Sequence, residues 1–212
     1  MALTDKLTAI ADAIRAKGGT TGTMTLAEMP EKIAAIQTGG AGGDDSVVSS
    51  IIGRSITEIL DNNVTSIGIY AFNSCKALTT VNLPAATSIG PYAFQSCTAL
   101  TSVDFPAATS IGTYTFDRCS ALKTADFQAV MEIRTYAFSN CLVLYSLILR
   151  SETMATLYNT NAFNSTPIKS GSGYIYVPAA LVDSYKTATN WSVYADQIRA
   201  IEDYPDITGG AA

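Results

Sequence analysis

The stretch IGIYAFNSCKALTTVNLPAATS at residues 67–88 decides the fold, because the chain repeats it. Close copies follow at 89–110 (IGPYAFQSCTALTSVDFPAATS) and 111–132 (IGTYTFDRCSALKTADFQAVME), and another begins at residue 133 (IRTYAFSNCLVLYSLILR). A unit this short cannot bury its own apolar face, whereas stacked units bury one another's faces and build a continuous core. The sequence therefore predicts a solenoid with one coil per copy.

Each copy carries the same apolar columns. The alternation of apolar and polar residues in LTTVNL at 78–83 predicts one short parallel strand per coil, with Val81 and Leu83 pointing inward. Pro84 cannot donate a ladder hydrogen bond, so we expect it to end the strand. Phenylalanines recur once per copy and are predicted to stack in the core; they are Phe72, Phe94, Phe116 and Phe138.

The pattern IGxYAFxxCxxLTxVxLP resembles the BspA type of bacterial leucine-rich repeat, cleanly over 67–150 and more loosely over about 50–201. The resemblance implies an α/β solenoid, a right-handed leucine-rich-repeat coil with short parallel strands and about five units. NAFNSTP at 161–167 is similar to a fifth copy in which Thr166 replaces cysteine. Residues 174–201 are similar to the cap that closes many arrays of this family, so the solenoid with its cap is expected to span 47–201.

Composition excludes several kinds of chemistry. The 212 residues contain no histidine, which excludes a Ser-His-Asp triad, a Cys-His dyad and histidine-ligated zinc. A formal net charge of −5 without a basic stripe argues against a nucleic-acid partner. We therefore expect a protein that is not an enzyme and that needs no metal or other cofactor.

Four cysteines lie one repeat apart, at Cys75, Cys97, Cys119 and Cys141. If they follow the strand spacing, their Cα atoms are close enough for a disulfide, but parallel side chains hold the Cβ atoms farther apart than a disulfide prefers. We predict buried, reduced thiols that pack as small hydrophobic groups.

Two outward columns are candidate binding surfaces. The first consists of Tyr70, Tyr92, Tyr114 and Tyr136. Its rings either cover the edge of the core or form a binding stripe, because aromatic rings with polar tips make good contact surfaces. The second consists of Asn82, Asp104 and Asp126. Its two acids are too few for a calcium cage. A glycosidase needs two carboxylates set across a substrate cleft, and a regular solenoid face offers no obvious cleft.

The ends of the chain differ from the array. Residues 1–38 place apolar residues at helical spacing and predict a helical hairpin too small to be stable alone, hence an attachment or oligomerisation module. They also resemble N-terminal segments of phage and prophage structural proteins from Gram-positive gut bacteria. A glycine-rich linker is expected at 39–46 and a flexible tail at 202–212.

Together these features predict a non-enzymatic binding or structural protein that presents its repeat surface to a protein or glycan partner and forms a homo-oligomer or larger assembly through 1–38. A phage or prophage tail appendage is the concrete version. The alternative is a bacterial surface adhesin or host-interaction protein, and a carbohydrate-active enzyme is a remote one.

The N-terminus lacks the apolar run of a signal peptide, and CLVLYSLIL at 141–149 is half of the roughly 20 residues that span a membrane. Cytoplasmic synthesis, virion association and no membrane insertion are therefore expected, with a cell-surface or secreted location as the alternative.

Overall fold

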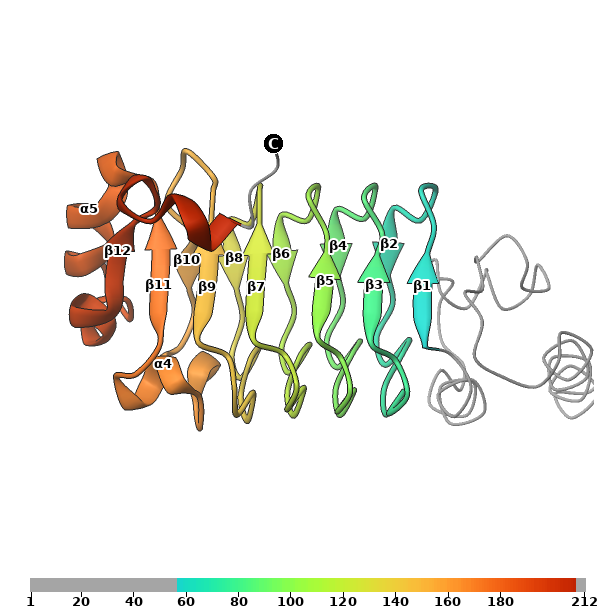
Figure 1. Ribbon diagram of the computed structural model, residues 1–212. Helices are drawn as coiled ribbons and strands as arrows, with labels where there is room; N and C mark the ends of the chain where they lie inside the picture. The colour runs from blue at the N-terminus through green and yellow to red at the C-terminus, as the bar shows by residue number, and fades with distance from the viewer. Residues whose placement is uncertain (1–56, 209–212) are drawn as a thin grey trace, which may run out of the picture.

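A computed structural model describes residues 57–208, which coil into a solenoid with two parallel sheets (Figure 1). Sheet A has the order β1-β3-β5-β7-β9-β11-β12, and sheet B has the order β10-β8-β6-β4-β2. The strands of sheet A are β1 (Glu58–Leu60), β3 (Thr80–Asn82), β5 (Ser102–Asp104), β7 (Thr124–Phe127), β9 (Ser146–Leu149), β11 (Tyr174–Val177) and β12 (Ile198–Ala200). Those of sheet B are β2 (Ser66–Ile67), β4 (Ser88–Ile89), β6 (Ser110–Ile111), β8 (Glu132–Ile133) and β10 (Thr156–Leu157).

Sheet B corrects the prediction of a single strand per coil. Its strands have only two residues each, so the sequence shows no alternation by which to recognise them. They nevertheless pair in register, with Ile67 opposite Ile89 and Ile89 opposite Ile111. Each coil from β1 to β10 thus runs up sheet A, turns, and returns through sheet B.

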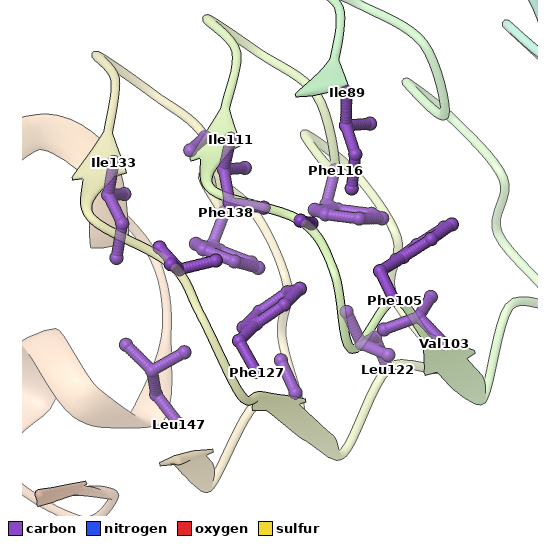
Figure 2. Close-up of a cluster of buried hydrophobic side chains, with 14 of the residues drawn as sticks. Ile89, Val103, Phe105, Ile111, Phe116, Leu122, Phe127, Ile133, Phe138 and Leu147 are labelled. Carbon is purple, nitrogen blue, oxygen red and sulfur yellow. The ribbon is translucent and has the colours of Figure 1, made fainter. Parts of the chain in front are cut away.

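The core lies between the two sheets. Figure 2 shows isoleucines of sheet B, such as Ile111, pointing toward Phe127 and Leu147 of sheet A, with the phenylalanine column between them. Neighbouring rings of this column are nearly parallel, with centroids 5.2 Å apart for Phe72 and Phe94. The other adjacent pairs from Phe94 to Phe163 lie at 5.6, 5.4 and 5.8 Å. Stacking of one residue type per coil therefore fills the space that the sheets enclose.

The turn after each sheet B strand is held by bonds between coils. The amide of Phe72 donates to the carbonyl of Ala93 at 2.7 Å, and that of Ser74 donates to the carbonyl of Gln95 at 2.7 Å. Tyr70 and Ser74 have φ of 60° and 61°, and the equivalent residues of the later coils do the same. A left-handed conformation is costly for residues other than glycine, and here the inter-coil ladder fixes it.

Helical turns are concentrated at the C-terminal end of the solenoid. They are η2 (Thr160–Phe163), α4 (Pro167–Ser170), η3 (Ala179–Leu181), α5 (Val182–Thr187), η4 (Ser192–Gln197), η5 (Ile201–Asp203) and η6 (Pro205–Thr208). The buried rings of Tyr185, Trp191 and Tyr194 cover the last coil. The indole of Trp191 donates to the carbonyl of Ala155 at 2.7 Å, which satisfies its polar atom.

Two features of this end were not anticipated. The chain returns through β12, which pairs in parallel with β11. Thr166, at the position of cysteine, is buried and caps α4 by accepting a hydrogen bond from the amide of Lys169 at 3.1 Å.

The tail predicted to be flexible begins at residue 202. Its described part, up to residue 208, contains most of η5 and all of η6. The predicted hairpin at 1–38 and linker at 39–46 lie outside the described residues.

Candidate binding surfaces

The outer face of sheet A carries one side chain per strand in a single row. The register places these residues next to one another across the sheet, and we call them the outer row: Leu60, Asn82, Asp104, Asp126, Ile148, Tyr176 and Arg199. Their strand neighbours, such as Val81 and Ala125, point into the core. The predicted Asn82, Asp104 and Asp126 column is therefore the middle of a longer row.

The middle of the outer row is polar and unevenly paired. The guanidinium of Arg150 donates to both carboxylate oxygens of Asp126, at 2.8 and 2.7 Å, and this hydrogen bonding raises the pKa of Arg150. Asp104 is exposed, and its carboxylate has no partner among residues 57–208. The Oδ1 atom of Asn82 is buried without a hydrogen bond. Asp104 is thus the acid of this row that is open to an external cation.

The tyrosine column forms a stacked ladder on a different part of the coil, directly after the strands of sheet B. Ring centroids are 4.7, 5.1 and 4.7 Å apart along the column, with interplanar angles of 16°, 9° and 15°. Tyr70 is 39% exposed, and the other three are half-buried. The rings therefore cover one another's faces.

Two tyrosines of this ladder also interact with neighbouring groups. The hydroxyl of Tyr136 accepts a hydrogen bond from the amide of Asn161 at 3.2 Å. Desolvation between neighbouring rings raises the pKa of the Tyr114 hydroxyl. The tyrosine ladder follows sheet B, whereas the outer row belongs to sheet A. The two predicted binding surfaces thus lie on different parts of each coil.

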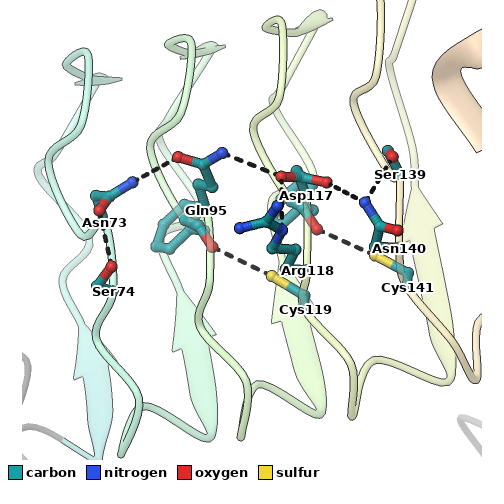
Figure 3. A network of polar contacts seen from close by, with 11 residues as sticks. Asn73, Ser74, Gln95, Asp117, Arg118, Cys119, Ser139, Asn140 and Cys141 are labelled. Carbon is teal, nitrogen blue, oxygen red and sulfur yellow. Dashed lines mark hydrogen bonds and ion pairs between the residues drawn. The ribbon is translucent and has the colours of Figure 1, made fainter.

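A second polar ladder, which the sequence did not reveal, crosses the coils beside the phenylalanines (Figure 3). Asn73 donates to Gln95 at 2.9 Å, and Gln95 donates to Asp117 at 3.0 Å. Asn140 donates to the other oxygen of Asp117 at 2.9 Å. Asp117 is 3% exposed, so its carboxylate is one of the few buried polar groups. The signal was the polar residue that follows each core phenylalanine.

The four cysteines are free and buried. Three of their thiols donate to the carbonyl of the phenylalanine one coil earlier: Cys97 to Phe72 at 3.1 Å, Cys119 to Phe94 at 3.2 Å and Cys141 to Phe116 at 3.0 Å. Burial is the main cause that raises the pKa of these three thiols. They act as inter-coil donors as well as small apolar groups, a role the sequence did not predict.

Within residues 57–208, no three or more cysteine, aspartate or glutamate side chains gather where they could hold a metal ion. No helix in that part of the chain combines the length and the apolar character that a membrane span requires.

The repeated coils match a known protein family. A family profile described as "BspA type Leucine rich repeat region" matches residues 53–169 in six copies. The chain belongs to this family. The six copies exceed the five or so units predicted.

The fold is also found in a solved crystal structure. The chain is similar to a leucine rich cell surface protein from Faecalibacterium prausnitzii A2-165 whose crystal structure is known, with 24% identity and a TM-score of 0.54. The match covers 68% of this chain and 36% of the other, so this chain spans about a third of that protein's length. No curated protein matches the sequence.

Proposed function

We propose that this BspA-type chain is a non-enzymatic binding protein whose outer row contacts a protein partner. The supporting observation is a contrast within the repeat. The phenylalanine, cysteine and tyrosine columns keep one residue type through four successive coils. The outer row instead changes from Asn82 to Asp104 to Ile148. A repeated scaffold with a varied face offers a specific set of contacts, and repeat proteins use such extended surfaces for binding.

The charge of the outer row favours a partner that presents lysine or arginine. Asp104 is exposed, and its carboxylate is free of partners within the described part of the chain. Asp126 beside it is already neutralised by Arg150. A carboxylate that gains a charge-assisted hydrogen bond on binding contributes strongly when water is excluded. Asp104 is therefore the residue we assign to the centre of the contact.

The tyrosine ladder is assigned to the scaffold. A sugar ring or a planar group needs a free aromatic face to stack on, and the faces of Tyr92 and Tyr114 are covered by their neighbours. The uniformity of the column also matches the core columns rather than the outer row. A protein partner is therefore favoured over a glycan.

A carbohydrate-active enzyme is disfavoured for a related reason. Hydrolysis of a glycosidic bond needs two carboxylates, one as acid and one as base or nucleophile. Asp104 and Asp126 are adjacent in register, but both oxygens of Asp126 accept hydrogen bonds from Arg150. One acid of the pair is thus engaged in the resting structure.

For the setting, we propose a cell-surface or host-contact role. The solved relative is described as a cell surface protein, which supports this setting over a phage appendage. The phage setting and the homo-oligomer or larger assembly both rest on residues 1–38, and the family match begins only at residue 53. They stay predictions that sedimentation of the full chain with and without residues 1–38 would test.

The experiment compares four forms of the full chain as bait for solubilised surface proteins: wild type, Asp104→Lys, Tyr92→Ser and Glu152→Lys. The last is a matched control, because Glu152 is an exposed acid outside the outer row. Loss of a desolvated charge pair costs on the order of 2–5 kcal/mol, so capture by Asp104→Lys should fall at least about tenfold. Equal capture by Asp104→Lys and Glu152→Lys, or a loss only with Tyr92→Ser, would contradict the proposal.

A further inference from the structure

Two residues of the outer row, on β9 and β11, are buried although they point away from the core. Ile148 is 0% exposed and Tyr176 is 5% exposed. Neither belongs to the cluster of side chains that forms the core, whereas their strand neighbours Leu147 and Ile175 do. Alternation along a strand places Ile148 and Tyr176 on the outer face. A segment on that face therefore covers them.

The chain's own C-terminal segment crosses this place. In Figure 1 the dark red end of the chain runs in front of β11 and β9, on the side away from sheet B. We call residues 201–208 the C-terminal strap. The ring of Tyr204 packs edge-on against that of Tyr176, with centroids 5.3 Å apart and planes at 72°. The amide of Ala179 donates to the carboxylate of Glu202 at 3.0 Å.

The strap is lightly held compared with what it covers. Its side chains from Glu202 to Asp206 are exposed, and Tyr204 is 40% exposed. Segments with little burial open at a low free-energy cost, whereas the strands beneath are part of the core. The strap should therefore open more readily than the strands that it crosses.

The charges on the two sides are complementary. Arg199 of β12 lies beside Tyr176 in the outer row, and its guanidinium lies over the ring of Tyr174 at 4.8 Å. The strap places Tyr204 among acids, in the order Ile-Glu-Asp-Tyr-Pro-Asp at 201–206. Desolvation, with smaller contributions from the neighbouring tyrosines, raises the pKa of Tyr176.

We propose that the outer face of β9 and β11 is a docking site for a short acidic peptide that carries an aromatic residue, and that the C-terminal strap occupies it in cis. Ile148 and Tyr176 form the apolar floor, and Tyr204 is the aromatic anchor. The site begins two strands beyond Asp104 along the outer row, and it does not depend on the partner proposed for Asp104.

The test uses the strap as a separate peptide. A chain that ends at Ala200 keeps all of β12 and lacks the strap; it is labelled with 15N and titrated with synthetic peptide IEDYPDITGGAA, residues 201–212. A segment tethered in cis acts at an effective concentration in the millimolar range, so a strap that stays docked should bind in trans with a Kd of about 1 mM or tighter. The amides of Ile148 and Tyr176 should shift saturably. A peptide with Tyr204→Ala should bind at least about tenfold more weakly, which is a loss of about 1.4 kcal/mol.

Two further measurements keep the proposal falsifiable. The full-length chain should bind the peptide more weakly than the shortened chain because its site is occupied, by about twofold if the trans Kd is about 1 mM and by more if the Kd is lower. If the shortened chain does not fold, full-length Tyr204→Ala takes its place and should bind the added wild-type peptide. Absence of saturable shifts up to several times this millimolar range, or equal binding by wild-type full-length and shortened chains, would overturn the proposal.

Discussion

We expect the free energy of unfolding to fall steeply between pH 8 and pH 10. Burial raises the pKa of Cys97, Cys119 and Cys141 above the ordinary value of 9.0. The folded chain therefore keeps three protons that the unfolded chain loses as the pH passes 9. Their stabilising contribution is complete below the unfolded pKa and declines as the pH rises above it.

The size of the fall follows from the number of thiols. A thiol that stays protonated in the folded chain lowers the free energy of unfolding by RT ln(1 + 10^(pH − pKa)), where the pKa is that of the thiol in the unfolded chain. Between pH 8 and pH 10 this lowering grows by about 1.4 kcal/mol. Three such thiols give about 4 kcal/mol, a large part of the roughly 5–15 kcal/mol that stabilises a typical domain. Their hydrogen bonds to the carbonyls of Phe72, Phe94 and Phe116 require the proton as well.

Urea unfolding followed by circular dichroism, at pH 8, 9 and 10 under reducing conditions, measures this fall. Cys119→Ala is the matched variant: it should be less stable at every pH because of the cavity, but its fall should be smaller by about 1.4 kcal/mol. Buried tyrosines such as Tyr194, whose pKa is raised to about 12, contribute equally to both chains and cancel in the comparison. A flat profile in wild type, or the same fall in both chains, would refute the reasoning.

Three further predictions use urea unfolding at pH 7. Phe116→Ala should cost about 3–5 kcal/mol, because this ring is fully buried between two others, and a cost under about 1 kcal/mol would argue against the stacked core. Asp117→Ala should cost about 1–3 kcal/mol, because it leaves the side-chain amides of Gln95 and Asn140 without their acceptor. Asp117→Asn should recover part of this loss, and equal costs of the two substitutions would argue against the ladder. Asp126→Ala should cost less than about 1 kcal/mol because its ion pair is partly exposed, and a larger loss would mean that the pair is structural rather than a surface feature.

The features that recur once per copy were predictable from sequence. The period gave the solenoid, and the columns of Phe72 and Leu78 gave the core, because stacking demands the same residue type at the same place in each coil. The strands of sheet A were recognisable from their alternation. Inward and outward positions followed from it, including Asn82 on the outer face.

Features that depend on contacts between different parts of the chain were not predictable. A two-residue strand such as β4 has no periodicity to recognise. The hydrogen bond from Cys119 to Phe94 needs the stagger of adjacent coils, which the sequence does not contain. The burial of Ile148 and Tyr176 was not predictable either, because alternation along their strands places both side chains on the outer face.

The assignment of binding to the outer row rather than to the tyrosine ladder is tested most directly by photo-crosslinking. The crosslinker p-benzoylphenylalanine replaces position 104 in one full-length chain and position 114 in another, and each chain is illuminated with the same surface extract. We predict a specific crosslinked partner from position 104 and none above background from position 114. Crosslinking from position 114 alone would contradict the account, because it would place the partner on the tyrosine ladder.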